Sequence, residues 1–225
     1  MTPPDLSGLE TDGLAVLPGL LDPAACARIA ALWEEPAQFR KQVVMGAHGY
    51  GQGAYRYFAD PLPAPVAALR ETLYPPLAAA ANRWAAALGR DARFPPDHAA
   101  YRARCHAAGQ RRPTPLLLRY GPGDYNRLHQ DLYGEEWFPF QLVLLLSAPG
   151  RDFTGGELVL TEQRARMQSR VEVVPLGQGD AAVFAVRDRP IAGARGVARA
   201  VMRHGVSRVR TGERMTVGVI FHDAA

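Results

Sequence analysis

Apolar and polar positions divide the chain into two regions with different periodicity. Up to about residue 110, alanine-rich stretches with helical spacing predominate, whereas after residue 113 short apolar runs alternate with turn residues. We therefore expect a mainly helical supporting region over residues 1–112 and a β-rich core over residues 113–225. Neither a repeat nor a low-complexity linker separates the two regions, so the pattern predicts a single domain.

Three helices are predicted in the first region. Asp22 followed by Pro23 is typical of a helix start, and Asp97 is a second candidate cap. Proline removes a backbone donor, so we expect the longest helix to be interrupted at Pro75 and Pro76. The predicted helices cover Ala24–Glu35, Pro65–Leu88, and the residues between Asp97 and Gly109. The segment Val43–Phe58 is rich in glycine and aromatic residues, which indicates a loop or hairpin.

Short strands with turn signals between them are predicted throughout the second region. They are Leu116–Tyr120, Phe138–Leu146, Glu157–Thr161, Val171–Val174, Ala181–Val186, Arg203–Val209 and Met215–His222. Many short strands at this spacing are typical of a sandwich, barrel or jelly roll. The expected fold class is α+β, with the helical region packed on a β-sandwich.

Composition narrows the class of protein further. The chain has 225 residues, of which 48% are hydrophobic and 21% charged, which suits a globular protein with a buried core. Its longest strongly apolar run, Leu142–Leu146, is far too short to span a membrane, and the first residues lack the pattern of a signal peptide. We expect a cytoplasmic protein with no membrane contact. Its two cysteines, Cys26 and Cys105, are too few for a disulfide framework or a cysteine-based zinc site.

Charge points weakly to an anionic partner. The formal net charge is +4, and Lys41 is the only lysine among the 26 basic residues. Between Arg187 and Arg214 arginines far outnumber acidic residues, so either nucleic acid or a small carboxylate is a candidate ligand. The sequence indicates no obligate protein partner.

A histidine and an aspartate lie two residues apart in the segment that follows Tyr120. On an extended strand His129 and Asp131 project from one face, and together they form two thirds of a facial triad for non-haem Fe(II). The best candidate for the third ligand is His204, because the intervening residues are enough for the predicted strands to bring the chain back.

A second pair of residues suits a dicarboxylate. Arg214 and Thr216 lie ten and twelve residues after His204 and share one face of a predicted strand. A guanidinium binds a carboxylate through two hydrogen bonds, and the hydroxyl adds one more donor.

The complete pattern resembles the Fe(II)- and 2-oxoglutarate-dependent dioxygenases, which carry His-x-Asp…His on a double-stranded β-helix. The resemblance implies that His129, Asp131 and His204 bind Fe(II) and that Arg214, with Thr216 beside it, binds the distal carboxylate of 2-oxoglutarate. It also implies turnover with O₂, which releases succinate and CO₂ and hydroxylates a substrate C–H bond. The turn Gly155–Leu158 resembles the Gly-Gly-x-Leu turn of prolyl-hydroxylase-like members.

A narrower resemblance extends over nearly the whole chain. Segments such as Arg112–Leu118, His129–Gly134, Asp152–Glu157, Thr161–Arg164 and Arg203–Arg208 are similar to a bacterial dioxygenase family assigned to oxidative repair of alkylated nucleic acid. Arg119–Asp131 is also similar to the segment of the AlkB demethylases that holds cofactor and iron, which implies that Tyr120 hydrogen-bonds 2-oxoglutarate. Leu118 replaces the AlkB asparagine, and the closing AlkB signature is absent.

Residues near the triad are candidate substrate contacts. Asn126, Arg127, Gln130 and Tyr133 flank the proposed ligands, whereas Arg56 and Arg208 are candidates for phosphate contact. The Tyr50–Phe58 segment offers aromatic faces for stacking, although packing between the helices and the sheet explains Tyr57 and Phe58 equally well. His222 reaches the site only if its strand is central.

Three functions remain open from the sequence. The first is oxidative demethylation of alkylated DNA or RNA. The second keeps the chemistry but acts on a peptidyl or free amino acid, or another small molecule, which the short spacing from His204 to Arg214 favours. The third is a cupin-like module that only binds a metal, and Arg214 with Thr216 argues against it because such a module needs no dicarboxylate clamp.

Overall fold

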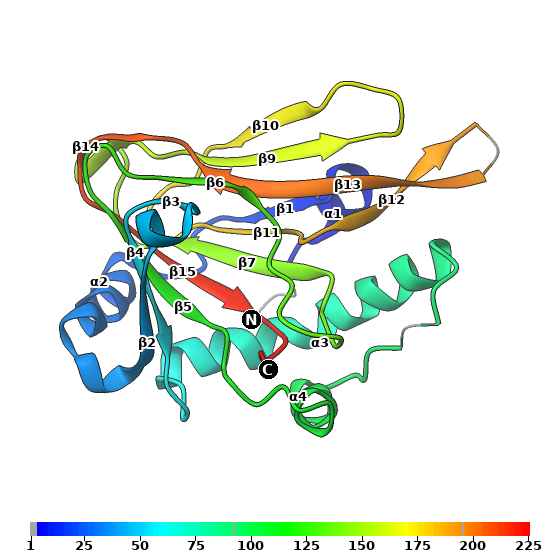
Figure 1. The fold of residues 1–225 in the computed structure, drawn as a ribbon, viewed down its shortest axis with the longest axis horizontal. Helices are drawn as coiled ribbons and strands as arrows, with labels where there is room; N and C mark the ends of the chain where they lie inside the picture. Colours follow the sequence, from blue (N-terminus) through cyan, green and yellow to red (C-terminus); the bar gives the residue numbers. More distant parts are fainter. Residues whose placement is uncertain (1–3, 92, 195) are drawn as a thin grey trace.

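Two antiparallel β-sheets face each other in the computed structural model, which describes residues 4–91, 93–194 and 196–225 (Figure 1). The larger sheet has the strand order β1-β11-β7-β15-β5-β4-β2. Its strands are β1 (Leu14–Leu17), β11 (Ala181–Ala185), β7 (Phe140–Leu145), β15 (Arg214–Ile220), β5 (Leu116–Tyr120), β4 (Ala54–Phe58) and β2 (Phe39–Val44). The facing sheets are the double-stranded β-helix, or jelly roll, that the sequence predicts.

The second sheet has the order β10-β9-β13-β6-β3, with β12 paired to β13. Its strands are β10 (Arg170–Val174), β9 (Leu158–Gln163), β13 (Gly196–Val206), β6 (Tyr125–His129), β3 (Gly51–Gln52) and β12 (Asp188–Gly193). A short ribbon of β8 (Phe153–Gly155) and β14 (Val209–Gly212) lies at one end. The β9–β10 and β12–β13 hairpins extend beyond the larger sheet on the right of Figure 1.

Helices cover the outer face of the larger sheet. They are α1 (Ser7–Asp12), α2 (Pro23–Ala31), α3 (Ala64–Ala87) and α4 (His98–Ala107), with single 3₁₀ turns η1 (Leu32–Glu34) and η2 (Pro36–Gln38). A third 3₁₀ turn, η3 (Met45–His48), lies instead beside β3 of the second sheet. Figure 1 shows α3 running beneath the sheet, where its Trp84 ring meets Phe140 of β7 at a centroid distance of 4.6 Å. All of β15 is buried because α3 lies against it on the outside and the second sheet covers its inner face.

The predicted helix starts are confirmed, but the predicted break in α3 is wrong. The Asp22 carboxylate accepts a hydrogen bond from the amide of Ala25, and the Asp97 carboxylate accepts one from Ala100. In contrast, α3 continues through Pro75 and Pro76. The buried side chains on both sides of the pair hold the helix on the sheet, and burying each one stabilises by about 2 kcal/mol, enough together to offset the cost of two prolines.

The region before residue 113 is less helical than predicted, because it contributes β1 to β4. The Val43–Phe58 segment does form a hairpin, in which Val43 of β2 pairs with Tyr55 of β4, and β4 then pairs with β5. The predicted strand Arg203–Val209 also needs correction. It is the end of the longer β13 followed by a separate strand, β14.

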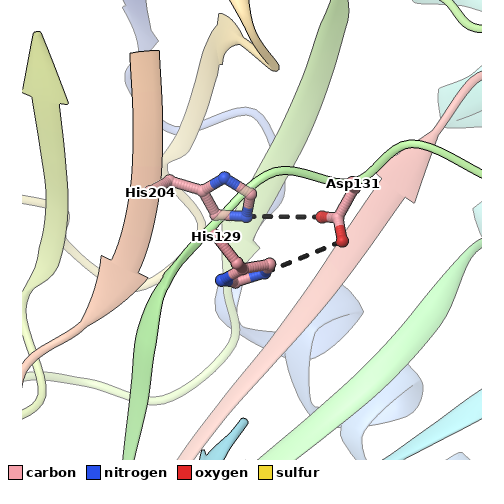
Figure 2. Close-up of side chains that lie close together, drawn as sticks. All are labelled: His129, Asp131 and His204. Carbon is pink, nitrogen blue, oxygen red and sulfur yellow. Dashed lines mark ion pairs between the residues drawn. The ribbon is translucent and has the colours of Figure 1, made fainter. Parts of the chain in front are cut away.

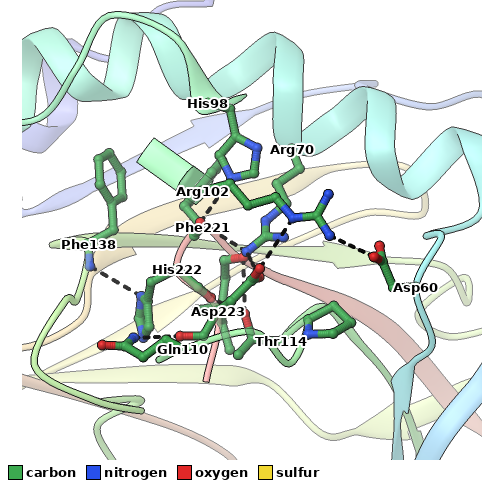
Figure 3. Close-up of polar contacts among 12 residues, drawn as sticks. Asp60, Arg70, His98, Arg102, Gln110, Thr114, Phe138, Phe221, His222 and Asp223 are labelled. Carbon is green, nitrogen blue, oxygen red and sulfur yellow. Dashed lines mark hydrogen bonds and ion pairs between the residues drawn. The ribbon is translucent and has the colours of Figure 1, made fainter. Parts of the chain in front are cut away.

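A buried polar cluster joins the helices to the end of β15 (Figure 3). The Asp223 carboxylate accepts hydrogen bonds from Arg70 of α3 at 2.7 Å and from His106 of α4 at 2.9 Å. His98 of α4 donates from Nε2 to the carbonyl of Phe221 at 2.9 Å. Although burial alone would raise the pKa of Asp223, the Arg70 guanidinium lowers it, so this carboxylate is charged in the folded protein.

No helix among the described residues combines the length and the apolar character that crossing a lipid bilayer requires.

Candidate active site

A cavity of about 600 Å³ lies between the two sheets. Strands β2, β4, β5, β7 and β15 line one side, and β6, β9 and β13 line the other. All six residues that the sequence predicts for metal and cosubstrate binding line this cavity: Tyr120, His129, Asp131, His204, Arg214 and Thr216.

Strand pairing brings the two histidines together. His204 of β13 is the cross-strand partner of His129 at the end of β6, and the centroids of their rings are 4.1 Å apart. Asp131 follows two residues after β6, and its side chain points between the two imidazoles (Figure 2). One Asp131 oxygen is 3.3 Å from His204 Nε2, and the other is 3.7 Å from His129 Nε2.

The protonation states of this His-Asp-His cluster suit a divalent transition metal. His129 Nδ1 donates to the carbonyl of Arg127 at 2.7 Å, which leaves the Nε2 lone pair directed toward the cluster. Burial lowers the pKa of His204 and keeps it neutral. Burial alone would raise the pKa of Asp131, but its contacts with His204 and His129 lower it, so the carboxylate is charged. One ligand atom from each residue lies within 4.8 Å of the others, and two imidazoles with one carboxylate are the donor set of non-haem Fe(II) enzymes.

Arg214 is a buried cation without an acidic partner. Its side chain is 2% exposed, its Nε and Nη1 have no hydrogen-bond partner, and no ion pair joins it to a carboxylate within the described residues. Burial lowers its pKa to about 10, so the guanidinium is still charged at neutral pH. A buried, unpaired charge of this kind costs several kcal/mol, and a carboxylate from a bound ligand would remove that cost. The cavity therefore fits a small dicarboxylate such as 2-oxoglutarate.

Tyr120 and Thr216 complete the surroundings of the guanidinium. Thr216 lies two residues further along β15 and is 1% exposed. The Tyr120 ring lies 5.5 Å from the Arg214 guanidinium carbon, and its hydroxyl is 3.5 Å from the amide nitrogen of Asn126. Both residues thus line the cavity beside the buried cation.

The predicted substrate contacts divide into two groups. Asn126, Arg127, Gln130 and Tyr133 line the cavity, and the Gln130 amide also donates to the carbonyl of Met202 at 2.7 Å. Arg56 and Arg208 do not line it.

Arg56 lies on the opposite face of β4 from the cavity. Its guanidinium bonds the carbonyl of Trp33 and the side chain of Gln42, and it covers the Trp33 ring at 4.4 Å. Arg208 is exposed outside the cavity, with its guanidinium 5.9 Å from the Tyr125 ring. His222 is buried behind the site, where its Nδ1 accepts a hydrogen bond from the amide of Phe138.

Three cations at the mouth of the cavity are absent from the predicted set. Arg40 and Lys41 of β2 and Arg112 before β5 all line it, and in the described part of the chain no ion pair joins any of them to a carboxylate. The Arg40 guanidinium lies 4.5 Å over the Tyr57 ring and donates to the carbonyl of Pro113. No common spacing links these three cations in the sequence. The only one that stands out there is Lys41, because it is the single lysine of the chain.

Comparison with known families now bears on this site. Residues 53–224, which include the whole His-Asp-His cluster and Arg214, match a family model described as an oxygenase that catalyses oxidative methylation of damaged DNA. The chain belongs to this oxygenase family. An uncharacterized protein of Mycobacterium tuberculosis (strain ATCC 25618 / H37Rv), Rv2227, is 48% identical over 180 residues, which are 80% of this chain and 77% of that protein.

Solved structures agree on the fold. A 2OG-Fe(II) oxygenase family oxidoreductase from Burkholderia pseudomallei is similar with a TM-score of 0.54 and 20% identity, over 97% of this chain and 90% of that one. A prolyl-4-hydroxylase from Pseudomonas putida is similar with a TM-score of 0.51 and 15% identity, over 96% of each chain. The family match makes this chain an oxygenase, its His-Asp-His cluster is a donor set suited to a divalent transition metal, and its fold is similar to that of the 2OG-Fe(II) oxygenase.

Proposed function

We propose that this oxygenase removes alkyl groups from DNA or RNA by oxidising the carbon attached to a base nitrogen. In this proposal His129, Asp131 and His204 hold Fe(II), which supplies O₂ activation when it is bound. Arg214, Thr216 and Tyr120 bind 2-oxoglutarate. The product of hydroxylation on an N-methyl group is a hydroxymethyl group, which leaves as formaldehyde.

The unpaired Arg214 supports the cosubstrate assignment most directly. Among the described residues its guanidinium is the one cation in the interior of the cavity, and the walls around it are largely apolar. A carboxylate that binds there replaces its hydration with two charge-assisted hydrogen bonds. The hydroxyls of Thr216 and Tyr120 orient the ligand without adding charge. The other end of the dicarboxylate then extends toward the His-Asp-His cluster, which lines the same cavity.

The charge at the cavity mouth supports a nucleic-acid substrate. Arg40, Lys41, Arg112 and Arg127 line the cavity, whereas Asp131 of the His-Asp-His cluster is the only acidic side chain that lines it in the described part of the chain. Elsewhere in the described chain many arginines pair with carboxylates, as Arg83 does with Glu10. Cations left unpaired around an opening attract a polyanion, and the family description names damaged DNA. Tyrosine rings beside them, those of Tyr50 and Tyr55, offer stacking faces for a base.

Turnover with a methylated oligonucleotide tests the proposal. Purified protein with Fe(II), 2-oxoglutarate and O₂ is expected to release succinate, and an N-methylated single-stranded oligonucleotide should increase the rate and yield an equal amount of formaldehyde. His129→Ala is the matched inactive control. Succinate release that never responds to methylated DNA or RNA would contradict the substrate assignment while leaving the dioxygenase chemistry intact.

Salt dependence separates a polyanion from a small ligand. Each phosphate contact contributes a slope of about −0.7 to the plot of log affinity against log salt for a single strand. Three or four contacts at the mouth therefore predict a slope of about −2 to −3. A slope near zero would contradict a nucleic-acid substrate.

A peptidyl or free amino acid is the second candidate substrate. The ten-residue spacing from His204 to Arg214 favours it, as does the similarity of fold to the prolyl-4-hydroxylase. Turnover of a proline-containing peptide, without a response to oligonucleotides, would support this candidate.

A further inference from the structure

The Asp131 carboxylate is held by a chain of two tyrosine hydroxyls. The Tyr133 hydroxyl donates to Asp131 Oδ1 at 2.7 Å, and the Tyr57 hydroxyl donates to the Tyr133 oxygen at 3.1 Å. Tyr133 follows Asp131 by two residues, whereas Tyr57 comes from β4 in the opposite sheet. The chain of hydroxyls therefore connects the metal cluster to the facing wall of the cavity.

Both tyrosine rings are fixed by their neighbours. The Tyr133 ring meets the Tyr57 ring edge to face at 6.3 Å and lies 5.9 Å from the His222 ring. Tyr57 is 8% exposed, and the Arg40 guanidinium covers its ring. Fixed rings lose little rotational freedom when their hydroxyls bond, so such a hydrogen bond holds its acceptor more firmly than one from a mobile side chain.

The Tyr133 hydroxyl forms its hydrogen bonds within the protein. A phenol has one proton to donate, and Tyr133 gives that proton to Asp131 and accepts the proton of Tyr57. The hydroxyl that the sequence predicts as a substrate contact thus acts on the carboxylate. Its ring can still form part of the cavity wall.

We propose that Tyr133 is the positioning residue for the metal-binding carboxylate and that Tyr57 supports it from the facing sheet. This inference rests on the proposed function, because it requires a metal at His129, Asp131 and His204. An oxygen that accepts a short hydrogen bond is a weaker second ligand, so Tyr133 favours attachment of the metal through the other oxygen, Oδ2, which faces His204. Partners of ligating carboxylates contribute strongly to metal affinity, and their loss typically weakens it 10- to 100-fold.

Metal binding to the full-length protein tests this role. Co(II) is titrated into the metal-free protein without 2-oxoglutarate, and both affinity and the visible absorption spectrum are recorded. Tyr133→Phe is expected to bind Co(II) about 10- to 100-fold more weakly and to shift the absorption bands, because the carboxylate is released to bind through both oxygens. Tyr57→Phe should weaken binding by a smaller factor in the same direction. Tyr125→Phe is the matched control, since it removes a hydroxyl from β6 that does not reach Asp131, and it should bind like the wild type.

The outcomes distinguish failure of the inference from failure of the proposed function. If the wild type does not bind Co(II), or His129→Ala binds it equally well, the metal assignment itself fails. If the wild type binds it and Tyr133→Phe has the same affinity and spectrum, only the positioning role is wrong. Should Tyr133→Phe not fold, as judged by circular dichroism, Tyr57→Phe decides, and unchanged affinity and spectrum in that variant would overturn the proposal.

Discussion

Gly156 lies directly against Arg214. A Cβ atom at position 156 would be 2.8 Å from Arg214 Cδ, and the backbone of Gly156 has a φ of +66°, which favours glycine. The turn after β8 thereby contacts the buried Arg214 side chain, and the absence of a side chain at Gly156 leaves room for it.

Replacing Gly156 should therefore impair cosubstrate binding. Gly156→Ala is expected to displace the Arg214 side chain and to weaken 2-oxoglutarate binding several-fold, measured by calorimetry on the metal-loaded protein. Gly150→Ala is the control, because Gly150 also has a positive φ, +79°, but a Cβ there meets nothing within 4 Å. Equal binding by the two variants would show that the contact with Arg214 is unimportant.

Arg214 is expected to lower the free energy of unfolding of the metal-free protein and to be necessary for 2-oxoglutarate binding. Arg214→Met keeps most of the volume and removes an unpaired buried charge, so the metal-free protein should gain about 1–3 kcal/mol in free energy of unfolding. The same variant should lose at least about 30-fold in affinity for 2-oxoglutarate, which corresponds to about 2 kcal/mol. Urea unfolding and ligand titration measure the two effects. A variant that is less stable yet still binds 2-oxoglutarate would contradict this role.

Two arginines on neighbouring strands, one lining the cavity and one on the opposite face, should differ in their effect on oligonucleotide binding. Arg40→Gln should weaken oligonucleotide binding and reduce the magnitude of the salt slope by about 0.7, as expected for the loss of one phosphate contact. Arg56→Gln should leave the slope unchanged, since Arg56 is bonded to Trp33 and Gln42 away from the cavity. Fluorescence anisotropy between low and moderate salt compares them. A larger effect from Arg56 would place the nucleic acid elsewhere.

Two buried histidines predict loss of stability in mild acid. Burial lowers the pKa of His98 and of His222 to about 4, whereas an exposed histidine has a pKa of about 6.5. Between these values the unfolded chain binds protons that the folded chain does not, so the free energy of unfolding falls as the pH drops from 6.5 toward 4. Each histidine contributes roughly 3 kcal/mol at most to this fall.

Unfolding curves recorded across this pH range check the prediction. In His98→Gln the pH dependence should be flatter, and the amide can still donate to the Phe221 carbonyl that His98 now bonds. An unchanged pH profile would show that His98 is not responsible.

The prolines within α3 predict a stabilising substitution. Pro75 is exposed and cannot donate a hydrogen bond to the carbonyl of Glu71, so Pro75→Ala restores a helix bond without loss of packing. The expected gain is about 1–3 kcal/mol, seen as a rise in the thermal midpoint. Pro65→Ala, in the first turn where no such bond is missing, should give no gain. If both variants behave alike, the effect comes from the unfolded chain.

The residues predicted for metal and cosubstrate binding follow strand spacing, and this is why the sequence could select a set that lines one cavity. His129 and Asp131 are two apart, as are Arg214 and Thr216, and period-two spacing places each pair on one side of the chain. Strands such as Leu116–Tyr120 were predictable for a related reason, since apolar runs between glycine-containing turns have few other structures available.

The cavity mouth could not be predicted because non-local pairing creates it. Arg40 and Arg112 converge only when β2 pairs with β4 and β4 pairs with β5, and no local pattern specifies that register. The position of Arg56 outside the cavity has the same origin. Once Ala54–Phe58 is known to be a strand, alternation places Tyr55 and Tyr57 toward the cavity and Arg56 on the other face.

Because His129 and His204 are cross-strand partners, binding of a metal by both depends on the alignment of β13 with β6. A slip of β13 by one residue against β6 would turn His204 to the opposite face and divide the cluster between two surfaces. A metal bound by all three residues thus favours one alignment over its near competitors, and the unfolding temperature should rise with the concentration of free metal. Without a bound metal, only the backbone pairing and side-chain packing of these two strands hold His129 opposite His204.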